Sequence, residues 1–335
     1  MTAILPRMLP EYVGGGTQKD QYGPDEVVEV PCPSCGATEG ATLAVENGSV
    51  GVKRCAACRL IYTSPRIHEP AAVYWGDHDF YLAESRMIFS GEATHHRDPN
   101  YIEELDLLER HAPARGRILD VGCNMGRLLS LARDRGWDTV GVEPSPALSR
   151  IAGEQFGLKV HNCFLHEVPD EEKGTFDALT TSDVFEHVPD PRGFLRDAAE
   201  FLKPDGVLYI KVPNARWKIF KQTTARLLGR EVARGAWDAF EDLVHYTDTT
   251  LATMLEREGF RTVELTLSRP VQVPVWHEYV GHYYQYPSPW VLDPKRYLGR
   301  IAFHAAARTE QRLRSGGIGY VAPNLVAVAR VGSAT

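Results

Sequence analysis

The stretch RILDVGCNMGRLL, residues 117–129, decides the fold. An aliphatic run ends in a carboxylate and passes through two glycines into an amphipathic segment. A strand, a tight glycine turn and a helix in this order form the nucleotide-binding corner of open α/β sheets. The spacing Gly122-x-x-x-Gly126 lacks the triple glycine that brings the backbone against a dinucleotide pyrophosphate. The stretch therefore argues against a nicotinamide dehydrogenase.

The sequence around this stretch also alternates between strand-like and helix-like segments. From residue 101 onward, short aliphatic runs alternate with segments of helical periodicity. This alternation predicts a doubly wound, Rossmann-like α/β sheet. The expected strands are residues 117–121, 139–142, 158–161, 176–181, 207–212, 261–268 and 325–331, and the expected helices are residues 127–135, 146–156, 191–202 and 249–258.

Two carboxylates follow the first two expected strands. Asp120 lies at the end of the first strand and Glu143 at the end of the second. The first would repel a pyrophosphate but attract an ammonium group. The second can accept hydrogen bonds from both hydroxyls of a ribose. A ligand with an amino acid at one end and a nucleoside at the other satisfies both carboxylates, and S-adenosylmethionine (SAM) has this form.

Four segments in order, ILDVGCNMG, VGVEPS, FDALTTSDVFEHVPDP and LKPDGVLYIKVPN, resemble the motifs of class I SAM-dependent methyltransferases. The resemblance covers residues 101–268 and the final strand. Asn124 stands where the family usually has glycine, and asparagine tolerates the left-handed backbone of such a turn. Cys163 could also be a small buried apolar residue. The resemblance implies that SAM lies against Asp120, Gly122, Cys123 and Gly126 on its methionine side, Glu143 at the ribose, Cys163 beside the adenine, and Ser182 and Asp183 below the sulfonium.

Four of the six cysteines form two pairs, in the pattern Cys32-x2-Cys35-x19-Cys55-x2-Cys58. This spacing predicts a zinc ribbon with four thiolate ligands, and a closed site of this kind is structural rather than catalytic. In a reducing cytosol such pairs favour metal over disulfides. Between residues 28 and 64, three acidic residues balance three basic ones, which argues against nucleic-acid binding. The arrangement resembles the zinc-ribbon front end of bacterial methyltransferases that act on sugars and secondary metabolites.

The segment TSDVFEHVPDP, residues 181–191, and a later histidine supply the candidate catalytic groups. Asp183, Glu186 and His187 share one face if the segment coils after the strand. His187 or His245 could be the general base that takes a proton from a hydroxyl acceptor. In a second interpretation, Asp183, Glu186, His187 and His245 hold Mg²⁺ or a similar divalent cation, in a site that resembles the acidic-x-x-Glu-His sites of ubiquinone-pathway and plant small-RNA O-methyltransferases. In a third, Glu186 and His187 only cap the turn.

The composition narrows the choice of partners. With 37 Lys and Arg residues against 44 Asp and Glu residues, the net charge of −7 gives no overall attraction to nucleic acid or anionic lipid. No apolar run reaches the length of a membrane span, and the first residues do not have the pattern of a signal peptide. We therefore expect a cytoplasmic protein without nucleic-acid or membrane partners. The oligomeric state is left open.

The chain is expected to contain four parts, with two insertions that carry substrate contacts. The first insertion includes a basic stretch, residues 215–235, that is either a solvated helix face or an anion contact. The second includes an aromatic cluster, residues 276–290, that suits a ligand pocket or a subunit interface. The parts are a tail at 1–27, a zinc ribbon at 28–75, a linker and cofactor lid at 76–100, and a methyltransferase domain at 101–335 with insertions at 214–245 and 270–322.

These features predict an enzyme, a SAM-dependent methyltransferase. The expected reaction is O-methylation of a small hydroxylated metabolite, a sugar or a secondary-metabolite intermediate, which could be anionic or carrier-bound. An RNA methyltransferase and a non-catalytic SAM-binding scaffold are the alternatives. The first would need a basic track between the ribbon and the active site. The second would bind SAM without turnover.

Overall fold

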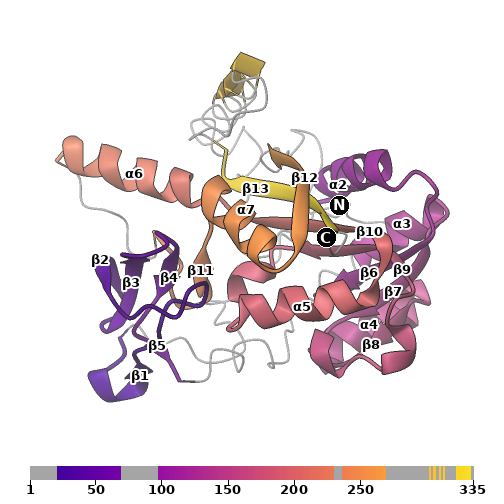
Figure 1. Ribbon diagram of the computed structural model, residues 1–335, viewed down its shortest axis with the longest axis horizontal. Helices are drawn as coiled ribbons and strands as arrows, with labels where there is room; N and C mark the ends of the chain where they lie inside the picture. The colour runs from indigo at the N-terminus through magenta and orange to yellow at the C-terminus, as the bar shows by residue number, and fades with distance from the viewer. Residues whose placement is uncertain are drawn as a thin grey trace, which may run out of the picture.

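A seven-stranded sheet forms the centre of the molecule (Figure 1). The computed structural model describes residues 21–68, 97–229, 236–268 and 322–332, with residues 302, 305, 306, 309, 310, 312 and 313. In the strand order β12-β13-β10-β9-β6-β7-β8, β13 runs antiparallel to both neighbours and the pairs from β10 to β8 are parallel. The strands are β6 (Arg117–Val121), β7 (Asp138–Val142), β8 (Lys159–His161), β9 (Phe176–Ser182), β10 (Leu202–Pro213), β12 (Phe260–Leu267) and β13 (Asn324–Val331).

Helices cover both faces of this sheet, so the predicted doubly wound fold is confirmed. Adjacent residues of β6 point to opposite faces: Ile118 packs with α2 and α3, whereas Leu119 packs with α5 and α7. In the described part of the chain, no helix is long and apolar enough to span a membrane. The helices are α2 (Asp98–His111), α3 (Arg127–Asp134), α4 (Pro146–Phe156), α5 (Pro191–Phe201), α6 (Ala215–Leu227) and α7 (Asp248–Arg257), with short 3-10 helices η1 (Pro24–Glu26), η3 (Leu165–Glu167), η4 (Asp170–Glu172) and η5 (Phe185–His187).

Local signals explain why the expected element bounds lie close to the observed ones. The side chain of Ser145 accepts the Leu148 N–H at the start of α4, and Asp190 accepts the Gly193 N–H at the start of α5. A proline follows each cap, as is common at the first position of a helix. The strand β10 differs most from expectation. It already begins at Leu202, and its pairing with β9 shifts register before it resumes at Val207.

The cysteine-rich segment forms a second, smaller sheet in the order β11-β4-β3-β2. A three-residue turn, Asn47 to Ser49, joins β2 to β3 in a hairpin, and Asn47 and Gly48 both have positive φ. The fourth strand, β11, comes from the expected first insertion and not from the ribbon segment. The strands are β2 (Gly40–Glu46), β3 (Val50–Cys55), β4 (Ile61–Thr63) and β11 (Val244–His245), and a separate pair joins β1 (Val27–Val28) to β5 (Arg66–Ile67).

Several expected segments lie outside the described residues. They include residues 1–20 of the tail, residues 69–96 with most of the expected lid, and residues 230–235 of the basic stretch. The aromatic cluster at 276–290 lies outside them as well.

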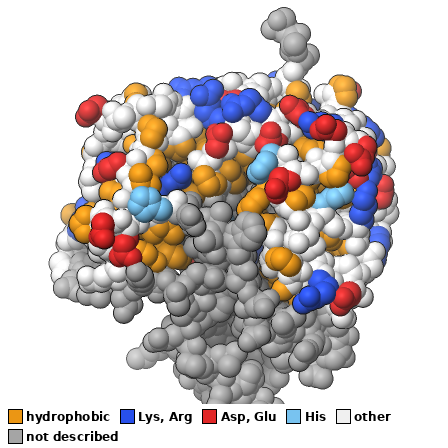
Figure 2. All heavy atoms as spheres, turned by 90° about the horizontal axis from the view of Figure 1, so that it is seen from below, with side chains coloured by type: hydrophobic (Ala, Val, Ile, Leu, Met, Phe, Trp, Pro, Cys, Tyr) orange, Lys and Arg blue, Asp and Glu red, His pale blue; other side chains and the backbone are white. Residues whose placement is uncertain are grey.

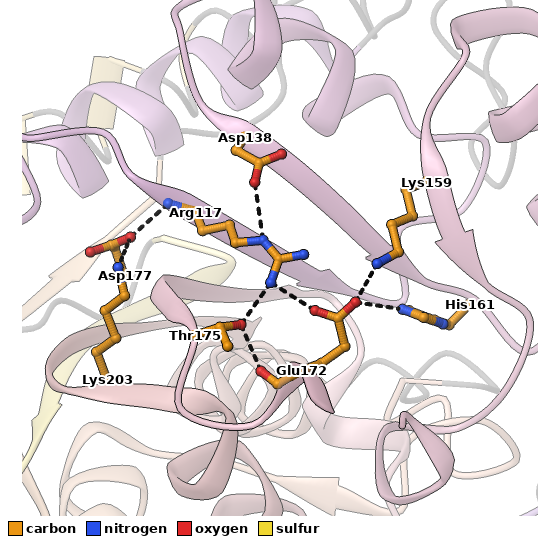
Figure 3. Close-up of polar contacts among 8 residues, drawn as sticks. All are labelled: Arg117, Asp138, Lys159, His161, Glu172, Thr175, Asp177 and Lys203. Carbon is orange, nitrogen blue, oxygen red and sulfur yellow. Dashed lines mark hydrogen bonds and ion pairs between the residues drawn. The ribbon is translucent and has the colours of Figure 1, made fainter. Parts of the chain in front are cut away.

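An ionic network ties the amino-terminal edge of the sheet together (Figure 3). The Arg117 guanidinium contacts Asp138 at 3.0 Å and Glu172 at 2.7 Å. The buried Glu172 carboxylate also pairs with Lys159 and lies 3.5 Å from His161. Burial alone would raise the pKa of Glu172, but hydrogen bonds from Lys159 and Arg117 outweigh it and lower the pKa to about 2. One carboxylate therefore joins the starts of neighbouring strands.

We expect Glu172→Gln to lower the free energy of unfolding at pH 7 by about 2 kcal/mol, because it leaves two cations without their shared anion. A carboxylate with a depressed pKa stabilises the fold above its unfolded pKa of about 4.3. That contribution is lost as the pH falls toward the folded value of about 2. Urea unfolding at pH 7 and at about pH 3 should therefore give a smaller difference at the lower pH.

The exposed neighbour Glu171 provides the control. Glu171→Gln should change the stability by less than about 0.5 kcal/mol. If Glu172→Gln were as stable as the wild type at pH 7, the network would have no net stabilising role.

Candidate active site

The glycine turn after β6 is fixed by the neighbouring strand. The N–H groups of Gly122 and Cys123 both donate to the Val142 carbonyl, at 2.8 and 3.1 Å. Gly122 has a φ of +75°, and a Cβ at this position would collide with Val184. Asn124 has a φ of +52° and accepts the Met125 N–H through its own side chain. Asparagine thus maintains the left-handed backbone where glycine is usual.

Two buried carboxylates stand at this edge of the sheet. Asp120 accepts the Thr180 hydroxyl at 2.7 Å, and Glu143 accepts the N–H groups of Asn124 and Ser145 at 2.8 and 2.9 Å. Burial raises the pKa of each carboxyl to about 7. Within the described ranges, no Lys or Arg forms an ion pair with either one. The pair therefore offers anionic acceptors that suit an ammonium group and ribose hydroxyls.

The two unpaired cysteines occupy different positions beside this turn. The Cys123 side chain is buried beneath the turn, where a Cβ on Gly141 would come within 2.6 Å of its Sγ. Only the backbone of Cys123 therefore helps to form the turn. Cys163 follows β8, is half-buried and packs against the core on the α5 side. Nearby, Asn162 donates to the Glu143 carbonyl at 2.8 Å, which joins this loop to β7.

Asp183 lies in an ion network at the end of β9 and is not among the side chains that converge with Glu186 and His187. Arg97 approaches its carboxylate at 2.7 Å and Lys211 at 3.2 Å. Burial would raise the pKa of Asp183, but these two cations lower it. Ser182 and Lys211 both contact Glu104 on α2, each at 2.8 Å. Because Asp183 is already balanced by two cations, it is poorly suited to bind a metal ion.

Glu186 and His187 form a cluster with Asp242, a residue that sequence reasoning missed. His187 Nδ1 lies 2.9 Å from the Glu241 carbonyl and 3.5 Å from the Asp242 carboxylate, while Nε2 lies 4.0 Å from Glu186. A carbonyl only accepts, so Nδ1 carries the hydrogen and neutral His187 has its lone pair on Nε2. Burial lowers the pKa of His187, but Glu186 and Asp242 outweigh it and raise the pKa. Glu186 is only 2% exposed, and burial raises its pKa, against the effect of His187, which lowers it.

Lys218 supplies the countercharge of this cluster. Its side chain is 7% exposed, and Nζ donates to the Asp242 carboxylate and the Trp237 carbonyl, each at 2.6 Å. Lys218 belongs to the basic stretch for which the sequence suggested a solvated face or an anion contact. This residue instead forms a buried ion pair. Asp242 stands three residues before His245, but nothing in that spacing indicates a partner on α6.

His245 occupies a different environment from His187. It lies in β11, is 2% exposed and packs edge-on against Trp237, with ring centroids 5.0 Å apart. Its Nε2 is 3.5 Å from the Thr63 hydroxyl, and burial holds its pKa well below the usual range. In the described part of the molecule, His245 does not join the cluster of Glu186, His187 and Asp242.

The four paired cysteines converge at the end of the ribbon. Their sulfur atoms lie within 4.8 Å of one another, with Cys32 to Cys58 and Cys35 to Cys55 both at 3.5 Å. A tetrahedral zinc ion with bonds of about 2.3 Å would hold its sulfurs about 3.8 Å apart. The Cys58 N–H points to the Cys55 sulfur, which is the direction that stabilises a thiolate. The geometry therefore suits a single tetrahedral metal ion.

Known proteins share the α/β part of the chain. The family model described as a methyltransferase domain matches residues 93–265, just over half of the 335 residues. Ubiquinone biosynthesis O-methyltransferases are 34% identical over 112 residues in Xanthomonas axonopodis (31% of this chain, 46% of the relative). The relative from Coxiella burnetii is 28% identical over 169 residues (48% of this chain, 71% of the relative). The relative from Bordetella avium is 34% identical over 158 residues (44% of this chain, 65% of the relative). The first match spans about half of its relative.

Solved structures with related folds have low sequence identity to the chain. A 1,6-didemethyltoxoflavin-N1-methyltransferase from Burkholderia thailandensis is 16% identical, with a TM-score of 0.44 over 88% of this chain and all of its own. A SAM-dependent methyltransferase from Archaeoglobus fulgidus is 18% identical, with a TM-score of 0.44 over 76% of this chain and all of its own.

The charges around His187 predict opposite effects for two substitutions. Asp242→Asn removes an anion, so the His187 titration midpoint should move to lower pH by about one unit. Lys218→Met removes a cation and should move the midpoint to higher pH. Both can be measured by NMR on protein with labelled histidine, with His187→Gln identifying the resonance. Equal midpoints in all three proteins would mean that Asp242 does not act on His187.

Proposed function

This chain belongs to the methyltransferase-domain family that matches residues 93–265, and we propose that it transfers a methyl group from SAM to a hydroxyl of a small metabolite. The acceptor class we favour is a sugar or a secondary-metabolite intermediate. The names of the ubiquinone-pathway relatives support an oxygen acceptor. Since these relatives match only part of the chain, our choice of acceptor class rests on the chemistry of the site.

The observation that carries the proposal is the pair of buried carboxylates beside the glycine turn. Asp120 would meet the ammonium group of SAM, and Glu143 would accept its ribose hydroxyls. Each Glu143 oxygen accepts one backbone N–H, which leaves capacity for a further hydrogen bond. No described cation pairs with either carboxylate, and this fits a ligand that brings its own positive charge.

The protein's share of the reaction is positioning and proton removal. When bound, SAM supplies a methyl group that is activated by its sulfonium. The residues of the site then need to align the acceptor oxygen with that methyl group, exclude water and remove one proton. We assign the removal of this proton to His187. Its Nδ1–H is held by the Glu241 carbonyl, so Nε2 takes the acceptor proton, and Glu186 and Asp242 stabilise the imidazolium that results.

A divalent cation is the alternative role for the same cluster. Glu186, His187 and Asp242 are close enough to share an ion, although Asp183 and His245 of the expected set are not part of this group. The Lys218 ammonium already lies 2.6 Å from Asp242. A cation would have to displace or tolerate that charge. We therefore favour a base over a metal site.

The surface supports a small acceptor over RNA. Figure 2 shows basic and acidic side chains interspersed over the described part of one face. Of the basic stretch, Lys218 is buried and Arg216 pairs with Asp248, so Lys221 and Arg226 are the described residues left for an anionic acceptor. A scaffold without activity would share the SAM site, and only turnover separates it from an enzyme.

For the ribbon we propose one structural zinc ion held by Cys32, Cys35, Cys55 and Cys58. The converging sulfurs and the closed, four-ligand set support this assignment. Such an ion would hold the two cysteine turns together and would have no open position for substrate. Native mass spectrometry of the purified chain should accordingly give one zinc per chain.

Binding of SAM should depend on pH through Asp120. Its carboxyl has a pKa of about 7 in the free protein and must be ionised to attract an ammonium group. Affinity should therefore rise about tenfold per pH unit between about pH 5 and pH 7, with one proton released at the lower pH. Calorimetry in two buffers with different ionisation enthalpies measures that proton. Asp120→Asn should remove the contribution of Asp120 and leave the weaker dependence due to Glu143, whereas Asp205→Asn at an exposed position should preserve the full dependence.

Turnover tests the whole proposal. With a panel of sugar and catechol hydroxyl acceptors, the wild-type protein should form S-adenosylhomocysteine. His187→Gln should slow this by about 10²- to 10⁴-fold with SAM affinity unchanged. The exposed His166 gives the matched control, His166→Gln, which should retain activity. Full activity in His187→Gln would exclude the base, and SAM binding without any turnover in the wild type would favour the scaffold.

A further inference from the structure

The ribbon sheet is completed by the segment that carries Asp242 (Figure 1). β11 pairs with β4, in the register Val244 to Tyr62 and His245 to Ile61. The Thr63 N–H continues this pairing to the Leu243 carbonyl at 2.9 Å. The Thr63 hydroxyl then donates to the Asp242 carbonyl at 2.7 Å. The ribbon therefore contacts the backbone of Asp242 directly.

The ribbon also holds the start of this segment. Glu46, the last residue of β2, accepts the N–H groups of Trp237 and Ala239 at 2.9 and 3.1 Å, one on each carboxylate oxygen. Trp237 is fully buried in a core shared with the ribbon residues Val50 and Val52. Residues 237–242 are thus fixed at both ends by one hairpin and the strand that follows it.

The opposite side of the segment faces the cluster. Leu243 donates to the Glu186 carbonyl at 2.9 Å, and the Glu241 carbonyl accepts from His187. A small displacement of the segment would therefore change both the tautomer-fixing hydrogen bond and the distance to the Asp242 carboxylate. The charged groups that face His187 from the segment and its own turn are Glu186, Glu241 and Asp242, with Lys218 on α6 behind Asp242. Asp183 at the end of β9 and His245 in β11 also interact electrostatically with it.

We propose that the four-cysteine ribbon is a positioning element of the active site, in which Glu46 and Thr63 hold residues 237–242 so that the Glu241 carbonyl and the Asp242 carboxylate face His187. Glu46 and Thr63 are positioning residues, because they act on His187 only through the segment. The inference uses the proposed role of His187, but the ionisation of that histidine can be measured without substrate or SAM.

The test is the His187 titration in the full chain, followed by NMR of labelled histidine. Thr63→Val removes the hydroxyl at nearly constant volume, and Thr63→Ser retains it. Glu46→Gln loses one of two acceptors and is a second, independent variant. Thr42→Val, at an exposed position of β2, is the matched control. His111, which bonds to Glu264 away from the ribbon, is the internal reference.

Thr63→Val and Glu46→Gln should each move the His187 midpoint to lower pH by about half a unit or more, because the anion moves away. Thr63→Ser, Thr42→Val and the His111 midpoint should match the wild type. The proposal is overturned if folded Thr63→Val and Glu46→Gln titrate as the wild type does. It is also overturned if His111 shifts together with His187, because that result indicates a general loss of structure. A failure of SAM binding or turnover would leave this measurement unaffected.

Discussion

The Glu143 carboxylate holds the carboxyl edge of the sheet in one arrangement. It accepts the N–H of Asn124, in the turn after β6, and the N–H of Ser145, the residue that caps α4. It therefore joins loops that belong to two successive βα units. Buried N–H groups left without an acceptor cost free energy, which makes this arrangement the favourable one. The Asn124 N–H, in the left-handed part of the turn, is one of the two groups that it accepts. The edge that we propose binds SAM is therefore joined across two loops by one side chain.

Buried charge organises the rest of the site. The carboxylates of Asp183 and Asp242 both lie in low-dielectric surroundings, and cationic side chains balance the negative charge of each. Asp120 and Glu143 are equally buried, but the described residues bring no cation to them. This difference separates carboxylates that the fold uses internally from those that remain available to a ligand. Asp183, which is balanced in this way, lies outside the group formed by Glu186, His187 and Asp242.

Much of the fold and half of the site follow from local sequence. The aliphatic runs, the Ser145 and Asp190 caps and the glycine turn each act within a few residues, so their pattern predicts the strands, the helices and the cofactor edge. The role of Asp183 was not predictable, because its partners Arg97 and Lys211 come from other elements. Asp242 was missed for the same reason. The role of Asp242 depends on its contacts with α6 and with the ribbon, and only the tertiary structure brings these together.

The two-residue strand β11 has a consequence for how this architecture is assembled and inherited. Thr63 and His245 are 182 positions apart, so β4 keeps an unpaired edge until residue 245 has left the ribosome. The ribbon is encoded first but completed late. A ribbon exchanged between relatives would carry its cysteines but leave its outermost strand behind. The unit that recombination would need to move is discontinuous, residues 28–68 together with 236–246.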